Sequence, residues 1–178
     1  MRKEKVEKKN ITFVDGQNLY GSSNENGWFV DYKKLAIYLK ENYNVGSIYY
    51  FVGYKREELE NLYSKIQKSG FQIVFKPHNQ NQKSEKKGNV DSDIIFESMK
   101  NIIVNTELNK VIIISGDGDY FNLVNFLIEQ SRFEKILFPN KRFASSLYKR
   151  LTARYYDYLE NIRGYIELKK SSPNEKGT

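Results

Sequence analysis

Two carboxylates separated by one glycine follow an apolar run in the second half of the chain. The segment Val111–Leu127 reads VIIISGDGDYFNLVNFL, so that Asp117 and Asp119 come shortly after apolar residues typical of a buried strand. A second apolar run ends in Asp15, with Asn18 three residues later. If both runs are neighbouring parallel strands, these side chains meet at one sheet edge, where ligands commonly bind. Each aspartate alone could instead be a turn or helix-capping residue.

A further carboxylate comes from a predicted helix over residues 90–104, which contains VDSDIIFESMKNII. Residues three and four apart share one face of a helix. Asp91 then lies on the apolar face with Ile95, whereas Asp93 lies with Glu97 on a solvated face. A charge on an apolar face needs a partner. We therefore expect Asp91 to face the sheet, and we explain Asp93 as a first-turn acid favoured by the helix dipole.

The residue types available restrict what could neutralise these carboxylates. Ionised aspartates without a positive partner would repel one another if they met. The chain has no cysteine and one histidine, His78, so a zinc or iron site of the usual type is not expected. Oxygen ligands alone favour a hard cation, Mg²⁺ or Mn²⁺, which can activate water and neutralise a phosphodiester. The predicted ligands are Asp15, Asp91, Asp117 and Asp119.

The composition limits the class of protein and its partners. The 178 residues suit one domain, and 29 Lys plus Arg against 22 Asp plus Glu leave a net charge of +7. A basic balance favours a polyanion such as nucleic acid, although it could serve solubility alone. No apolar run approaches the roughly 18 residues that cross a membrane, and the charged N-terminus does not resemble a signal peptide. Together with the lack of cysteine, this favours a cytoplasmic protein without a membrane partner.

Apolar runs alternate with amphipathic segments along the chain. This alternation predicts an α/β fold with a mostly parallel sheet of five or six strands. We expect a charged arm over residues 1–9, one domain over 10–168 and a disordered tail over 169–178. The expected strands are 11–14, 47–52, 71–75, 111–115 and 135–138, and the expected helices are 32–43, 56–68, 90–104, 120–130 and 142–151, with 155–168 ambiguous.

Three segments together resemble the motifs of a known family. FVDGQNLY, KKGNVDSDIIFESM and VIIISGDGDYFNLV look like the three motifs of the NYN domains, PIN-like nucleases close to the bacterial LabA-like group. The resemblance covers roughly residues 10–160. It implies a Rossmann-like, three-layer fold and a metal-dependent ribonuclease site. One departure is an extra residue, Asn89, before the valine of the second motif, which could shift the start of the helix.

The resemblance also implies roles for individual residues. The family's serine falls on Ser115, and its asparagine falls on Asn18, which would orient a water or a phosphate oxygen. Asn18 could equally be a turn residue at the strand end. The catalytic positions implied by the family are Asp15, Asn18, Asp91, Asp117 and Asp119.

Basic and aromatic residues near the predicted site could hold RNA. Lysine and arginine would supply phosphate contacts, and exposed aromatic rings could stack on unpaired bases. The basic candidates are Lys76, Lys83, Lys86, Lys87, Lys141, Arg142, Lys149, Arg150 and Arg154, and the aromatic candidates are Tyr20, Trp28, Phe29 and Tyr120. From these candidates we select Lys87, Tyr120 and Arg142 as substrate contacts. Asn18 and Ser115 from the family motifs complete the predicted set.

These features support a metal-dependent ribonuclease acting on RNA that is single-stranded, with Mg²⁺ or Mn²⁺ as cofactor. An alternative is a catalytically weak RNA-binding or regulatory module that keeps the acidic site. A phosphatase is a third possibility, but a haloacid-dehalogenase pattern would have an aspartate where this chain has Gln17. A homo-oligomer is compatible with each of these functions.

Overall fold

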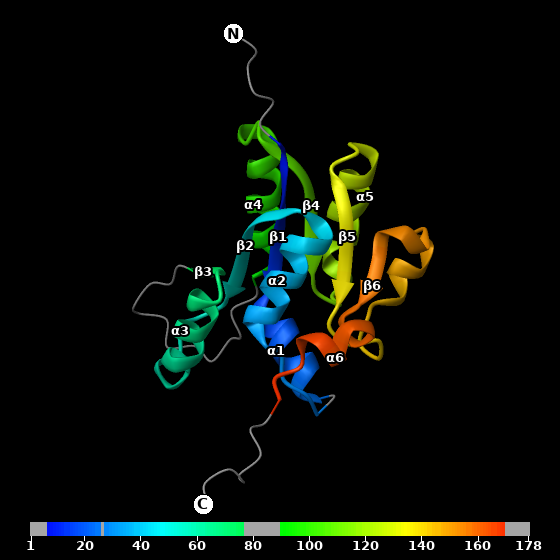
Figure 1. The fold of residues 1–178 in the computed structure, drawn as a ribbon. Helices are drawn as coiled ribbons and strands as arrows, with labels where there is room; N and C mark the ends of the chain where they lie inside the picture. The colour runs from blue at the N-terminus through cyan, green and yellow to red at the C-terminus, as the bar shows by residue number, and fades with distance from the viewer. Residues whose placement is uncertain (1–6, 26, 77–89, 170–178) are drawn as a thin grey trace, which may run out of the picture.

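A six-stranded parallel sheet forms the centre of the molecule (Figure 1). The structure is a computed structural model, and it describes residues 7–25, 27–76 and 90–169. The strand order is β3-β2-β1-β4-β5-β6, and every neighbouring pair is parallel. This confirms the predicted α/β class. The strands are β1 (Lys9–Asp15), β2 (Val45–Val52), β3 (Gln72–Phe75), β4 (Leu108–Ile114), β5 (Phe133–Phe138) and β6 (Tyr156–Tyr158).

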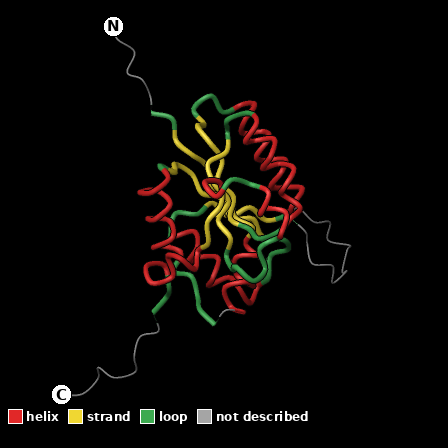
Figure 2. The backbone as a smooth tube through the Cα atoms, turned by 90° about the vertical axis from the view of Figure 1, so that its right-hand side faces the viewer, coloured by secondary structure: helices red, strands yellow, loops and turns green. Residues whose placement is uncertain are grey.

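Helices cover both faces of the sheet, as the side view in Figure 2 shows. One face carries α1 (Gly16–Glu25), α2 (Tyr32–Tyr43), α3 (Glu60–Lys68) and α6 (Arg163–Ile166), and the other carries α4 (Asp91–Val104) and α5 (Phe121–Glu129). Short 3₁₀ helices span Glu57–Leu59, Gly118–Tyr120, Ser146–Arg150, Ala153–Tyr155 and Leu159–Ile162. Among the described residues, no helix has the length and apolar character needed to cross a membrane.

The central strands β1 and β4 have largely apolar sequences because helices cover both of their faces. Consecutive side chains of a strand point to opposite faces. Phe13 and Ile113 enter the core beneath α4 and α5, whereas Val14 and Ile114 enter the core beneath α1 and α2. All four side chains are fully buried. A sheet covered on both faces therefore favours apolar residues in the second halves of β1 and β4, where the buried Thr12 is the polar exception.

Helix α2 has the bounds that the sequence predicts, because both of its ends carry a local signal. The Asp31 carboxylate accepts a hydrogen bond from the backbone N–H of Lys34, which caps the first turn. The helix stops at Asn44, which adopts the left-handed conformation with φ of 48°.

Three segments differ from the prediction. Helix α1 was not expected, because its sequence GQNLYGSSNE is polar and rich in weak helix formers. Strand β6 lies in the segment that was ambiguous. The helix expected over 142–151 was wrong, since only Ser146–Arg150 is helical and it is a 3₁₀ turn. The backbone N–H of Ser145 donates to the carbonyl of Gly116, so the start of this segment is held against the β4 loop instead.

Candidate active site

The ends of β1 and β4 lie side by side, as the acidic motifs predict. Val14 pairs with Ile114 in the parallel register, so Asp15 at the end of β1 and Ser115 directly after β4 lie at the carboxyl edge of the sheet. Asn18 links the start of α1 to the loop after β4, because its Oδ1 accepts a hydrogen bond of 2.8 Å from the backbone N–H of Gly116. Asn18 thus has a structural role, and its side-chain amide nitrogen is the group that remains as a donor.

Three carboxylates gather at this edge. Asp91 is the first residue of α4, while Asp117 and Asp119 come from the loop after β4. One carboxylate oxygen from each lies within 4.8 Å of the others. In the described part of the chain, no lysine or arginine forms an ion pair with Asp117 or Asp119. Three hard oxygen donors this close together fit a divalent ion such as Mg²⁺ or Mn²⁺.

The loop between Ser115 and Asp119 holds its own shape through local hydrogen bonds. The Asp117 N–H donates to Ser115 Oγ at 3.1 Å, and the Asp119 N–H donates to Asp117 Oδ1 at 3.0 Å. Asp117 therefore caps the 3₁₀ helix Gly118–Tyr120, which is the alternative role that the sequence allowed. It belongs to the acidic cluster at the same time. Ser115 is fully buried. Its predicted contact with substrate was wrong, because the hydroxyl is inside the protein and accepts this backbone bond.

The glycine between the two aspartates is required by a close approach. A Cβ atom at Gly118 would lie 2.7 Å from Ser145 Oγ, which no side chain tolerates without movement. The same neighbouring segment supplies Tyr148, whose hydroxyl donates to the backbone carbonyl of Asp117 at 2.5 Å. Burial and the charge of Asp117 raise the pKa of Tyr148, so the hydroxyl stays protonated as a donor. No signal in the sequence linked Tyr148 to Asp117, which lies 31 residues away.

Asp15 lies outside the group of three carboxylates whose oxygens are within 4.8 Å of one another, so its role as a fourth ligand stays a prediction. Its side chain is buried. Oδ1 accepts a hydrogen bond from the backbone N–H of Asn18, and Oδ2 lies 3.4 Å from the Tyr120 hydroxyl. Burial raises the pKa of Asp15 to about 6, and the charges of Asp91 and Asp117 add to this effect.

Tyr120 separates Asp15 from the cluster. Its hydroxyl donates to Asp91 Oδ1 at 2.5 Å. Burial, followed by the charges of Asp15 and Asp91, raises the pKa of Tyr120, so the phenol remains protonated. The predicted stacking of Tyr120 on a base was wrong, because the side chain is fully buried. Tyr120 instead orients Asp91, a role that its type and position alone did not indicate.

Asp91 and Asp93 have different surroundings, as expected, but the details of the helix face differ. The buried positions of α4 are Ile94 and Ser98: Ser98 belongs to the predicted stripe with Ile95, whereas Ile94 does not, and Ile95 itself is partly buried. Asp91 still reaches the cluster. Asp93 is half-buried and lies 3.8 Å from the amino group of Lys76, and so it is not the fully solvated residue that we expected.

The segment between β5 and β6 carries exposed basic side chains and contacts the loop after β4. Its backbone contacts the β4 loop through Ser145 and Gly116. The exposed basic residues of this segment are Lys141, Arg142, Lys149, Arg150 and Arg154. Lys83, Lys86 and Lys87 lie outside the described residues. Of the aromatic candidates, Tyr20 and Phe29 are exposed, whereas the Trp28 ring is buried and was wrongly expected to be available for stacking.

Comparisons with known proteins are consistent with this arrangement. Residues 10–160 match the family model described as NYN domain. The chain is 23% identical over 165 residues to Low amplitude and bright protein LabA from Synechococcus elongatus, covering 87% of this chain and 86% of that protein. It also resembles the crystal structure of a Vibrio parahaemolyticus protein of unknown function, VPA0982, with a TM-score of 0.68 and 20% identity over 93% of this chain and 100% of that one. At this identity, the structural match shows the fold alone.

Proposed function

Because this chain belongs to the NYN domain family, we propose that it is a metal-dependent ribonuclease that cleaves single-stranded RNA. The observation that carries the proposal is the cluster of Asp91, Asp117 and Asp119. The net charge of +7 supports a polyanionic substrate. The resemblance to PIN-like nucleases supports hydrolysis of a phosphodiester as the reaction.

The three clustered aspartates are the proposed ligands of Mg²⁺ or Mn²⁺. When bound, such an ion lowers the pKa of water and offsets negative charge on a phosphodiester. The chain holds two of the ligands through its own hydrogen bonds: Tyr120 donates to Asp91, and the backbone N–H of Asp119 donates to Asp117. These fixed positions reduce the reorganisation needed when a metal or a phosphate arrives.

Asp15 and Tyr120 control the charge next to the ligands. Since the pKa of Asp15 is raised to about 6, this carboxyl carries its proton in mildly acidic solution and adds a fourth negative charge above that range. A phenol has one proton, and Tyr120 uses it for the short hydrogen bond that it donates to Asp91. When Asp15 is protonated, its own O–H can donate to the phenol oxygen across the 3.4 Å contact.

RNA would approach over the segment between β5 and β6. Its exposed cations, Arg142 among them, would bind backbone phosphates without reading sequence. Asn18, through its side-chain amide nitrogen, would donate to a phosphate oxygen or a water next to the cluster. Lys87 remains a proposed phosphate contact on the basis of its position before Asp91 in the sequence.

Incubation of the protein with labelled single-stranded RNA tests this function. We expect cleavage in Mn²⁺ or Mg²⁺, none in EDTA, and none with Asp117→Asn purified in the same way. The variant controls for a contaminating ribonuclease, which would cleave in both preparations. Equal cleavage by the variant, or cleavage that persists in EDTA, would overturn the proposal.

An RNA-binding module without turnover is the second candidate. It is favoured by the burial of Asp15 and Ser115, both of which accept hydrogen bonds from the backbone of the protein itself. This candidate predicts that RNA binds tightly and remains intact over hours in Mn²⁺. Cleavage that depends on the metal and on Asp117 would exclude it.

A further inference from the structure

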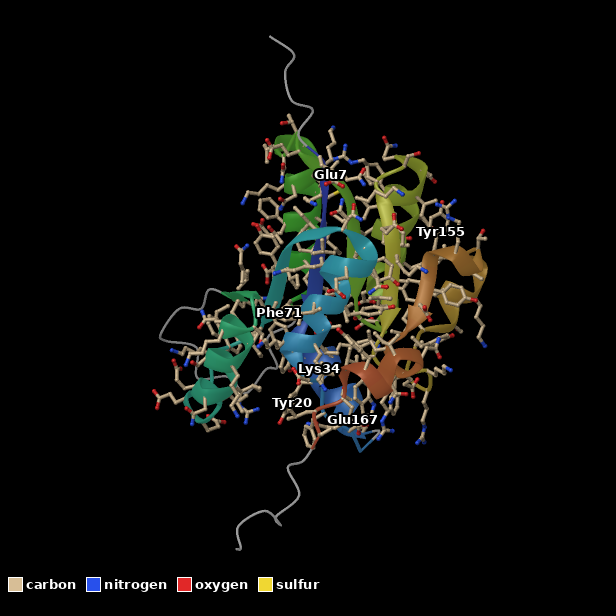
Figure 3. All side chains as sticks on the ribbon, in the orientation of Figure 1. Glu7, Tyr20, Lys34, Phe71, Tyr155 and Glu167 are labelled. Carbon is tan, nitrogen blue, oxygen red and sulfur yellow. The ribbon has the colours of Figure 1, made fainter. Side chains whose placement is uncertain are left out.

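A concave pocket lies on the other side of α1 from the acidic cluster. Its volume is about 570 Å³, within the range of pockets that bind small molecules. Helix α1 contributes Tyr20 and Asn24 to its wall, while Asn18, on the same helix, reaches toward the cluster through Gly116. Figure 3 labels Tyr20 near the lower end of the molecule, below Lys34. The pocket and the cluster therefore share α1 as a common wall.

Two exposed aromatic rings line this pocket. The Tyr20 and Phe29 side chains are 40% and 44% exposed, which is unusual for rings that could pack in the core. The backbone at Phe29 is fixed, because its carbonyl accepts a hydrogen bond of 2.8 Å from the N–H of Leu168. Two residues later, the Asp31 N–H donates a hydrogen bond of 2.7 Å to the Ile166 carbonyl. Backbone hydrogen bonds therefore hold the chain at Phe29 and at Asp31. Phe29 is thus an aromatic surface on a rigid support.

Three lysines surround the rings. Lys33 belongs to the first turn of α2, and Lys65 and Lys68 belong to the last turn of α3. In the described part of the chain, none of the three forms an ion pair. The dipole of α3 explains cations at its carboxyl end, but the dipole of α2 disfavours Lys33 at its amino end. One acid also lines the pocket, Asp31, and its carboxylate caps α2.

We propose that this pocket binds an unpaired nucleotide of the RNA strand, a few nucleotides away from the bond that is cleaved. The base would stack on Phe29 or Tyr20, and the phosphates would contact Lys33, Lys65 and Lys68. The proposal rests on the proposed function for its substrate class. Six residues of helix separate Asn18 from Asn24, which corresponds to roughly 9 Å along α1. One strand can therefore occupy the pocket and cross the helix to the cluster.

The test measures binding of a fluorescein-labelled, single-stranded RNA by anisotropy in EDTA, so that cleavage does not intervene. Phe29→Ala should weaken binding roughly tenfold, since a base–aromatic stack commonly contributes that much. Lys65→Ala/Lys68→Ala should lower the slope of log K against log salt by about 1.4, which corresponds to two phosphate contacts on a single strand. An excess of adenosine monophosphate should compete only weakly.

Matched variants control for general effects. Phe126→Ala removes a ring of similar exposure, 38%, from α5. Lys8→Ala/Lys100→Ala removes two charges from outside the pocket, of which Lys100 pairs with Glu97. Neither control variant should change the RNA affinity or the slope of log K against log salt. Wild-type binding by both pocket variants would overturn the proposal. Tight binding of adenosine monophosphate at this pocket, with no effect of the pocket variants on RNA, would overturn it in favour of a free nucleotide.

The same variants separate this proposal from the ribonuclease function. If RNA is cleaved in Mn²⁺ and the pocket variants cleave with unchanged KM, the function stands and the pocket proposal fails. If the pocket variants lose RNA binding while the wild type never cleaves RNA, the pocket proposal stands and the ribonuclease function fails.

Discussion

The buried hydroxyl of Tyr120 donates a hydrogen bond of 2.5 Å to the carboxylate of Asp91. Removing that hydroxyl should let Asp91 rotate away from its two partners. We predict that Tyr120→Phe lowers kcat for RNA cleavage by roughly 10-fold to 100-fold, as is typical when a group that orients a metal ligand is lost. KM for RNA should stay the same, because the Tyr120 ring is buried and does not reach the substrate.

Tyr148→Phe is the control for this prediction. It also removes one hydroxyl that bonds at the site, but the acceptor is the backbone carbonyl of Asp117 and not a carboxylate. Both variants should lose about 1 kcal/mol of stability in urea unfolding. Tyr120→Phe should lose much more activity than Tyr148→Phe, and equal losses would show that Tyr120 has only a structural role.

Asp15 should make stability depend on pH. Its pKa is about 6 in the folded protein and near 3.8 when unfolded, because burial disfavours the charged form. The folded state then binds the proton more tightly, so this contribution is complete below about pH 4 and is lost as pH rises through about 6. Asp15→Asn keeps an oxygen to accept from Asn18 and never ionises.

In EDTA at pH 7.5, Asp15→Asn should therefore be more stable than the wild type by up to about 3 kcal/mol. At pH 4 the difference should vanish. Urea unfolding at several pH values measures both quantities. A variant that is less stable than the wild type at pH 7.5 would mean that the ionised carboxylate is a needed hydrogen-bond acceptor.

Asp91 and Asp93 provide a matched pair on one helix. Asp91→Asn should reduce metal-dependent cleavage by on the order of 100-fold or more, since it removes a proposed ligand. Asp93→Asn loses a 3.8 Å contact with Lys76 at a half-exposed site, which should cost at most about 1 kcal/mol and little activity. Cleavage rates of both variants in Mn²⁺ check this, and the reverse order would mean that Asp93 is the ligand.

Metal addition should stabilise the fold through the same carboxylates. At 100 times its Kd, a bound Mn²⁺ adds about 2.7 kcal/mol to the free energy of unfolding. Thermal melts of the wild type should therefore shift upward in Mn²⁺ and return in EDTA. Asp119→Asn should melt at a similar temperature in both conditions. A metal shift that survives in this variant would place the ion elsewhere.

The sheet and the meeting of its acidic loops were predictable, because they follow from local patterns. Strands β1 and β4 are mostly apolar over 11–14 and 111–114, with Thr12 as the exception, as strands covered on both faces require. The turn residues after them then mark the carboxyl edge. The prediction that Asp91 joins Asp117 and Asp119 needed only helical spacing and the cost of burying a charge.

The parts that were missed depend on tertiary contacts. Helix α1 forms although its sequence is polar, because Leu19 is buried and Gly16 packs where a Cβ would lie 2.3 Å from the Tyr50 ring. Tyr120 can lie in the core because its hydroxyl donates a hydrogen bond to Asp91, a residue 29 positions away. Neither propensity nor spacing reports whether an aromatic ring beside a loop faces water or the core, so the same pattern misplaced Trp28.

The single-turnover rate of RNA cleavage as a function of Mn²⁺ concentration tests the central claim most directly. It compares the wild type with Asp119→Asn, whose side chain is exposed and is not needed to pack the core. We predict a rate that rises and saturates with Mn²⁺ in the wild type, and a rate roughly 100-fold lower at saturation in the variant. A rate that is the same in EDTA as in Mn²⁺, or the same in both proteins, would contradict a metal-dependent ribonuclease site at Asp91, Asp117 and Asp119.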